Sequence, residues 1–144
     1  MNDGPALPAG TPGGFALSLL REIAVRLAVL AETGEPHAID LTGLPMSKRD
    51  CEELEELLGH GEVEAALDVA GETRVWETRY SGVWWIRHMG AGDRVASERI
   101  EIVAVPQILC ADPADIAAAA RRFADDLAER NDTIPQEESV HVPA

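Results

Sequence analysis

The sequence has few cysteines, few lysines and few aromatic residues, and each scarcity argues against a class of protein. The 144 residues include two cysteines, Cys51 and Cys110. Two are too few for the disulfide framework of a small secreted domain, and their spacing matches no zinc motif. Lys48 is the single lysine, and 12 basic against 26 acidic side chains give a formal net charge of −14. Because phosphate contacts need clustered Lys and Arg, this balance argues against nucleic acid and against an anionic membrane surface. We predict a cytoplasmic protein with reduced thiols.

The chain also lacks an apolar run long enough to cross a membrane. Its most apolar segment, residues 15–30, is shorter than the roughly 20 residues that a span needs, and it carries Arg21, Glu22 and Arg26. The N-terminus has neither a basic region nor a cleavage pattern after an apolar run, so we expect no signal peptide. A hydrophobic fraction of 46% is ordinary for a globular protein of this length.

The patterning that is present predicts one α+β domain. We predict a flexible leader over residues 1–14, a single domain over residues 15–131 and a disordered tail over residues 132–144. Helical periodicity is found near residues 15–33, 47–58 and 113–130, and strand alternation near residues 62–70, 73–80, 83–89 and 94–105. Short glycine-containing connections predict a four-stranded antiparallel β-meander covered by about three helices, in the order α-α-β-β-β-β-α. Residues 37–44 are expected to be an extended or 3₁₀ connection.

The first predicted helix, residues 15–33, is apolar around more than one face. Leu17, Leu20, Val25 and Leu27 cannot all face one small sheet. Either this is a central core helix, or one of its faces lies on its own sheet and another on a partner or a second copy. We therefore predict self-association, most simply a homodimer through helix 15–33.

The last predicted helix begins near Asp112-Pro113, where a capping Asp precedes a Pro suited to the first turn. Its apolar residues recur at helical spacing along one side. This spacing predicts a stripe that faces the core: Ile116, Ala120, Phe123 and Leu127.

No motif for catalysis or cofactor binding is recognisable. Gly90-Ala91-Gly92 lies between strands and is too short for a dinucleotide fingerprint. Cys51 lies in the first turn of a predicted helix, where the dipole can lower a thiol pKa, but His60 lies at the far end of that helix. The histidines and cysteines are not paired at spacings that pre-build a metal site. We predict no catalytic residue, no cofactor and no metal site; the alternative is a thiol- or metal-dependent carrier that uses Cys51, Cys110 or the histidines.

The feature that rises above background is a group of aromatic residues with interleaved arginines on two adjacent strands. Alternation places Trp84 opposite to Trp85, so one can fill the core while the other meets an uncovered face. Two interpretations stay open: cross-strand packing that stabilises a hairpin, and an anchor for a partner, since Trp, Tyr and Arg dominate binding hot spots. The predicted partner site has the exposed member of Trp84 and Trp85 at its centre and comprises Trp76, Arg79, Tyr80, Trp84, Trp85 and Arg87.

Several segments also occur in a particular order between residues 37 and 130. They are Ile39-Asp40-Leu41, Leu57-Leu58-Gly59-His60-Gly61, Gly71-Glu72-Thr73-Arg74, Gly82-Val83-Trp84-Trp85-Ile86-Arg87 and Ile100-Glu101-Ile102-Val103-Ala104-Val105-Pro106. This ordered set resembles the HupH-type hydrogenase expression and formation family, which includes the HyaF-like proteins; Ser81 stands where family members usually have Pro. The resemblance implies a non-catalytic accessory protein in nickel–iron hydrogenase maturation. It further implies a chaperone whose partner is the iron–sulfur small subunit or another maturation protein, and it brings no catalytic residue.

Overall fold

The structure is a computed structural model that describes residues 13–68 and 70–133. The chain divides into two compact units, Met1–Pro106 and Gln107–Ala144, and each is described by itself. The predicted leader and tail lie almost wholly outside the described residues, although Gly14 and residues 132–133 belong to helices. The single domain over residues 15–131 stays a prediction.

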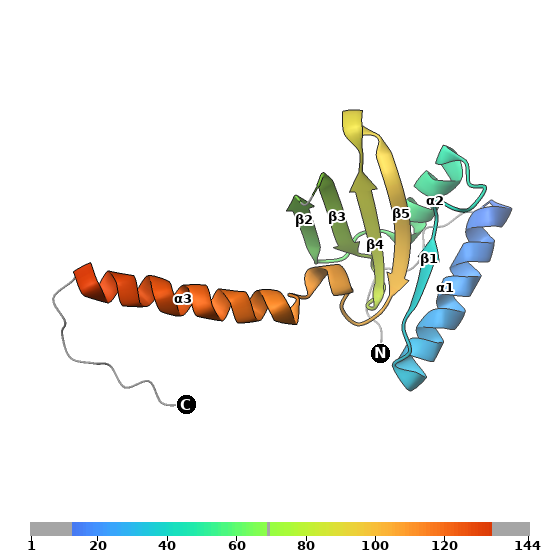
Figure 1. Cartoon of the computed structure of the whole chain (residues 1–144). Coiled ribbons are helices and arrows are strands. Elements are labelled where there is room, and N and C mark those ends of the chain that lie inside the picture. The colour runs from blue at the N-terminus through green and yellow to red at the C-terminus, as the bar shows by residue number, and fades with distance from the viewer. Residues whose placement is uncertain (1–12, 69, 134–144) are drawn as a thin grey trace. The chain divides into compact units, whose positions relative to one another are not determined.

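The first unit is built on a five-stranded antiparallel sheet with the strand order β1-β5-β4-β3-β2 (Figure 1). Its elements are α1 (Gly14–Thr33), β1 (His37–Asp40), α2 (Lys48–Leu58), β2 (Glu64–Asp68), β3 (Glu72–Glu77), β4 (Val83–Met89), a 3₁₀ turn (Ala91–Asp93) and β5 (Val95–Ile102). The α+β class is confirmed. The predicted number of four strands is wrong, because His37–Asp40 pairs with β5 from His37 opposite Ile102 to Asp40 opposite Arg99. The order is therefore α-β-α-β-β-β-β-α.

Local sequence signals determine where the two helices of this unit begin and end. Ser47 caps α2: its hydroxyl accepts a hydrogen bond from Asp50 N at 3.0 Å, and the Asp50 carboxylate accepts one from Ser47 N at 3.0 Å, which together form a capping box. Gly34 ends α1 at φ +77°, and Gly59 ends α2 at φ +68°. Both positions have a positive φ, which glycine adopts without the steric cost that a side chain would add.

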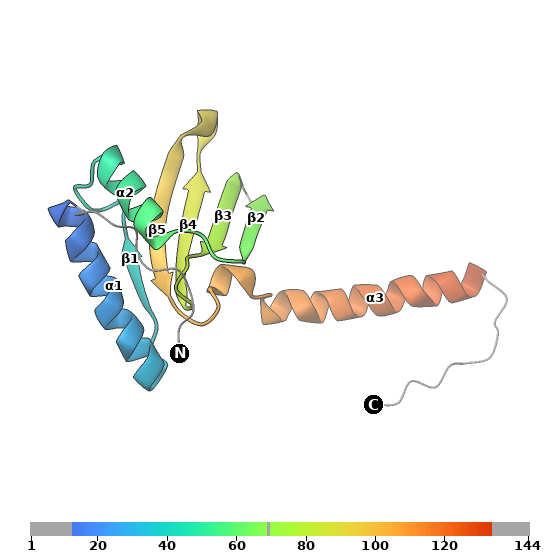
Figure 2. The ribbon, with the colours of Figure 1, turned by 180° about the vertical axis from the view of Figure 1, so that it is seen from behind.

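The core of the first unit lies between one face of the sheet and the two helices. Figure 2, seen from behind, shows α2 in front of β5 and α1 beside β1. The core residues come from α1, α2, the loop after β1 and one face of β1, β3, β4 and β5: Leu19, Ile23, Ile39, Leu41, Leu54, Leu58, Trp76, Val83, Trp85, Ile100 and Ile102. Leu20 and Leu27 of α1 also pack against this core, whereas Val25 is 62% exposed. Predicted self-association through α1 stays a prediction.

The opposite face of the sheet is also buried at its centre. Val75, Trp84 and Ile86 point away from the core cluster, and all are buried. The expectation that one face of the aromatic strands is uncovered is therefore wrong. The strands alternate as predicted, but apolar side chains on both faces of their central part are shielded from solvent.

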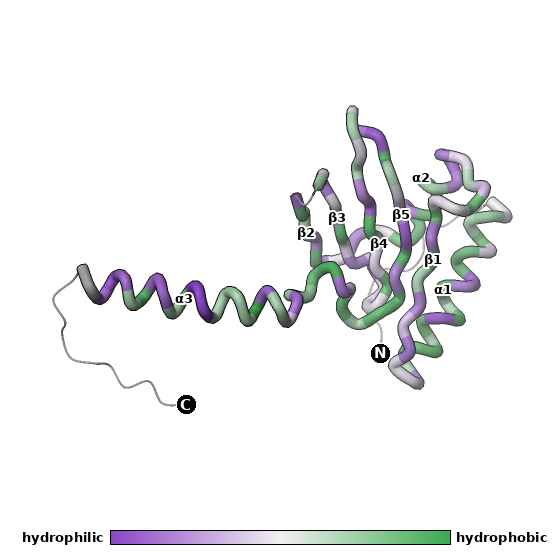
Figure 3. Tube along the Cα trace, in the orientation of Figure 1, coloured by the Kyte–Doolittle hydropathy of each residue, from purple (hydrophilic) through white to green (hydrophobic). Residues whose placement is uncertain are grey.

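The second unit contains a 3₁₀ turn (Gln107–Leu109) and α3 (Pro113–Thr133). Apolar and polar residues alternate along α3 (Figure 3). Ile116, Phe123 and Leu127 are 56%, 66% and 50% exposed, so no described part of this unit covers the predicted stripe. Among the described residues, no helix combines the length and the apolar character needed to cross a membrane.

Candidate binding site

Charged and aromatic side chains gather where α2 crosses the sheet. The strand register places Trp76 opposite Trp85 and Arg87 opposite Glu98, so these four residues share the face that α2 covers. Leu54 and Leu58 anchor α2 on this face, which brings the intervening Glu55 and the preceding turn down onto the strands. We name this group the Arg87 cluster: Cys51, Glu55, His60, Trp76, Trp85, Arg87 and Glu98.

The Arg87 guanidinium joins α2 to the sheet. Its Nη2 donates a hydrogen bond to Glu55 Oε1 on α2, and its Nε donates to Glu98 Oε2 on β5 at 2.9 Å. Burial lowers the pKa of Arg87, but the hydrogen bond to Glu55 and the charge of Glu98 more than offset it, and the net pKa is raised above the usual value. The side chain is therefore a permanent cation held between two carboxylates.

Three rings are stacked under this guanidinium. His60 lies parallel to Trp76 with ring centroids 4.7 Å apart, and Trp76 lies parallel to Trp85 with centroids 5.7 Å apart. The guanidinium carbon of Arg87 is 5.0 Å from the centroid of Trp76, within cation–π range. Trp85 Nε1 donates to Glu98 Oε2 at 2.6 Å. These contacts fix the position of each ring and each charge.

Cys51 is a poor nucleophile in this environment. Its thiol donates to Glu98 Oε1 at 3.5 Å. Burial, and then the negative charge of Glu98, raise the pKa of Cys51 to about 12, so the thiolate is scarce at neutral pH. The helix-dipole effect considered from the sequence is outweighed. Among the described residues, no group of three or more His, Cys, Asp and Glu side chains could hold a metal ion.

The structure brings together half of the predicted partner-site residues. Trp76, Trp85 and Arg87 lie in the Arg87 cluster, whereas Trp84 lies on the opposite face and donates from Nε1 to Val103 O at 3.1 Å. The prediction that Trp84 or Trp85 is exposed is wrong, because their exposures are 5% and 0%.

The remaining two predicted residues follow β3. Tyr80 is half-buried against the core cluster. Arg79 N donates to Leu58 O at 3.0 Å, and a Cβ on Gly59 would lie 2.6 Å from Arg79 Nε. The guanidinium of Arg79 therefore packs against the C-terminal end of α2, where a positive charge complements the helix dipole.

The sequence analysis did not select the acidic members of the cluster. These acidic members are Glu55 of α2 and Glu98 of β5. The sequence does contain a signal for Glu98. It lies two residues before Ile100 and four before Ile102, both buried, so strand alternation places its carboxylate on the same inner face. A carboxylate on the inner face requires a cation or a hydrogen-bond donor. Arg87 lies two residues after Trp85, so alternation places it on the inner face as well.

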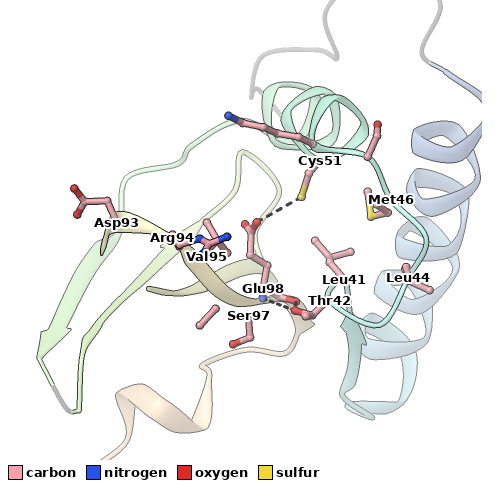
Figure 4. A pocket seen from close by; sticks show the side chains of 13 residues that line it. Leu41, Thr42, Leu44, Met46, Cys51, Asp93, Arg94, Val95, Ser97 and Glu98 are labelled. Atoms are coloured by element: carbon pink, nitrogen blue, oxygen red, sulfur yellow. Dashed lines mark hydrogen bonds between the residues drawn. The ribbon is translucent and has the colours of Figure 1, made fainter. Parts of the chain in front are cut away.

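An open groove lies next to the Arg87 cluster (Figure 4). Its volume is about 460 Å³. One side is formed by Leu41, Leu44 and Met46 of the segment between β1 and α2 and by Cys51 of α2, and the other side by Val95–Glu98 of β5. We name it the β5 groove. Glu98 belongs to both the groove and the cluster, so whatever occupies the groove lies against the same carboxylate that holds Arg87.

The fold and the site thus define an α+β protein in which the charged side chains of the Arg87 cluster form ion pairs with one another. The chain belongs to a known family: residues 15–129 match the HupH hydrogenase expression protein, C-terminal conserved region. The family resemblance stated from the sequence is confirmed.

Individual relatives agree with this assignment. The chain is 34% identical over 88 residues to the hydrogenase expression/formation protein HoxQ of Azotobacter vinelandii, covering 61% of this chain and 31% of that one. It is 29% identical over 125 residues to the hydrogenase expression/formation protein HupH of Rhizobium leguminosarum bv. viciae, covering 87% and 43%. The chain therefore spans less than half the length of these relatives. Among solved structures, the hydrogenase expression protein HupH from Thiobacillus denitrificans is similar with a TM-score of 0.75 and 43% identity, covering 83% of this chain and 99% of that one.

Proposed function

We propose that this chain is a non-catalytic accessory protein in nickel–iron hydrogenase maturation, acting as a chaperone on the iron–sulfur small subunit. The observation that carries the proposal is the family match over residues 15–129, joined by relatives that are named hydrogenase expression/formation proteins. The choice of the small subunit comes from the family resemblance.

The state of the reactive groups supports a binding role. Arg87 is held by Glu55 and Glu98, and the Cys51 thiol stays protonated because its pKa is raised to about 12. These groups join α2 to β4 and β5 and thereby give the domain a fixed surface. Rigid surfaces of this kind are suited to recognition of a protein partner.

The predicted partner residues have different roles in this proposal. Trp76, Trp84 and Trp85 are buried, so they support the surface residues by packing beneath them. Arg79 and Tyr80 are half-buried and are proposed to contact the partner directly. The net charge of −14 favours long-range attraction of a basic partner surface.

The test is a pull-down from a host that expresses the hydrogenase genes, using the affinity-tagged full chain. We expect the small subunit to co-purify with the chain and Arg79→Ala to reduce its recovery. The control is Arg74→Ala, which removes an exposed ion pair with Glu64 and should leave the recovery unchanged. Recovery of only the large subunit would contradict the proposed target. Recovery of no hydrogenase protein at all would contradict the proposed function.

A complementation experiment separates the chaperone from a carrier. A strain that lacks this gene is supplied with the wild-type gene, Cys51→Ser or Cys110→Ser, and hydrogenase activity is measured. A chaperone predicts that both variants restore activity. Loss of activity in a variant that folds and still binds the hydrogenase would support the thiol-dependent carrier instead.

A further inference from the structure

The edge of the sheet at β5 is only partly covered. The register of β1 with β5 ends where Asp40 lies opposite Arg99. Beyond this pair, Leu41 N donates to Glu98 O at 2.9 Å and Glu98 N donates to Thr42 Oγ1 at 2.8 Å. From Ser97 back to Val95, β5 has β4 on one side, and no strand among the described residues pairs with its other side. An open strand edge is a template for another extended chain.

The register of this segment is irregular, and its residues are exposed. Met89 pairs with Val95 and His88 pairs with Ser97, so one extra residue, Ala96, is inserted in β5 as a bulge. Val95, Ala96 and Ser97 are all exposed. They form one wall of the β5 groove, so the open edge and the groove are a single feature of the surface.

The opposite wall of the groove contains a group of apolar side chains. Leu41, Leu44 and Met46 line it, with the protonated thiol of Cys51 beside them (Figure 4). A volume of about 460 Å³ is within the range of ligand-binding pockets. Alternate side chains of an added strand would lie about 7 Å apart on this wall, which suits apolar side chains at every second position.

Glu98 supplies one of two carboxylates in this groove; Asp93 is the other, and Thr42, Ser47, Lys48, Arg94 and Ser97 also line it. Glu98 Oε2 already accepts hydrogen bonds from Trp85 and Arg87, whereas for Oε1 the recorded donor is the weak thiol of Cys51 at 3.5 Å. Arg87 also neutralises Glu55, so two carboxylates share one guanidinium. An ammonium or guanidinium group would give Oε1 a strong donor and balance the charge of the pair.

We propose that the β5 groove binds an extended, apolar segment of a partner protein that carries a basic side chain, added as a strand to the free edge of Val95–Ser97. The main chain of the segment pairs with β5, its apolar side chains lie on Leu41, Leu44 and Met46, and its basic side chain meets Glu98. The inference rests on the proposed function for the expectation that the partner is a protein, and it names the surface and the chemistry of the bound segment.

The test uses a fluorescein-labelled, acetylated heptapeptide of alternating valine and threonine with one central lysine. Binding to the full chain is followed by fluorescence polarisation, and the contact region by amide chemical shifts. We expect shifts at Val95–Ser97 and at Leu44 and Met46, since Pro45 between them has no amide proton. A peptide with glutamate in place of lysine is expected to bind at least tenfold more weakly, because it would place a carboxylate against Glu98.

Val95→Lys and Val63→Lys form a matched pair of variants. Both side chains are similarly exposed, 47% and 44%, but Val95 lies at the β5 edge and Val63 precedes β2 at the other edge of the sheet. We expect Val95→Lys to weaken peptide binding at least tenfold and Val63→Lys to leave it unchanged. Because both positions are on the surface, the thermal melt of each variant verifies that the fold is intact.

Several outcomes would overturn the inference. Equal loss in both variants, or amide shifts confined to β2, would place the peptide elsewhere. A wild-type dimer that Val95→Lys converts to a monomer would show that a second copy occupies the edge. If Val95→Lys binds the hydrogenase subunit normally in the pull-down, the groove is wrong but the proposed function stands; if the wild type binds no hydrogenase protein, the proposed function fails independently of the peptide result.

Discussion

The Arg87 cluster predicts a large loss of stability when its single guanidinium is removed. Arg87→Met keeps the apolar contact with Trp76 and Trp85 but leaves Glu55 and Glu98 without their cation. Removing one partner of a buried ion pair costs about 3–5 kcal/mol. Since Arg87, Glu55 and Glu98 retain 21%, 27% and 12% side-chain exposure, water screens them in part. We expect a loss at the lower end of that range, about 3 kcal/mol.

Urea unfolding followed by tryptophan fluorescence measures this loss, because all three tryptophans lie in the first unit. With an m-value of about 1.5 kcal/mol/M, the unfolding midpoint should fall by about 2 M. Arg74→Met is the matched control: Arg74 lies opposite Arg87 in the ladder, but its ion pair with Glu64 is exposed, and its loss should cost less than about 1 kcal/mol.

A triple variant tests the cause of the loss. Arg87→Met combined with Glu55→Gln and Glu98→Gln removes the uncompensated carboxylates and should recover at least about half of the lost stability, since a buried ion network can be replaced by neutral groups at little net cost. The reasoning is refuted if Arg87→Met costs no more than the Arg74→Met control, or if the triple variant is less stable than Arg87→Met alone.

Three further variants probe local features. Because the pKa of Cys51 is raised from 9.0 to about 12, the unfolded chain loses this proton first, and stability should fall as the pH rises above 9; thermal melts of Cys51→Ala should show a shallower decrease there. Ser47→Ala removes the cap of α2 and should cost about 1 kcal/mol in urea unfolding. Gly61→Ala would place a Cβ 2.6 Å from the backbone oxygen of Thr78 and should cost about 1–3 kcal/mol in the same assay, whereas Gly14→Ala, where nothing lies within 4 Å, should not destabilise.

The sequence was sufficient to predict the elements whose signals are local. The helix over residues 47–58 was predicted from its periodicity, and the structure has it as α2, with a capping box of Ser47 and Asp50 at its start and Gly59 at its end. The β3–β4 hairpin was predicted from the alternation of apolar residues and from the short turn at Gly82. In both cases a few neighbouring residues specify the backbone, so no knowledge of the tertiary structure is required.

The elements that were missed depend on residues distant in the chain. His37–Asp40 has only one buried side chain, Ile39, and it is a strand because β5, about sixty residues later, offers its edge. Trp84 was placed on the correct face by alternation, but burial of that face depends on the surroundings of the sheet and not on the period of the strand. Glu98 was not selected for the same reason: an inward carboxylate is tolerated only because Arg87 and Trp85 of the neighbouring strand donate hydrogen bonds to it.

The parallel rings of Trp76 and Trp85 also give the protein an optical signature of its own. Two indoles whose centroids are 5.7 Å apart and whose planes differ by 6° are close enough for their excited states to couple, so the circular dichroism of the pair depends on how the two rings are placed. His60 stacks on Trp76, and its Nε2 lies 3.5 Å from Glu55 Oε2 of α2, so the environment of the pair depends on the position of α2. A change in this spectrum on partner binding is therefore expected, without any label, if α2 moves away from the sheet.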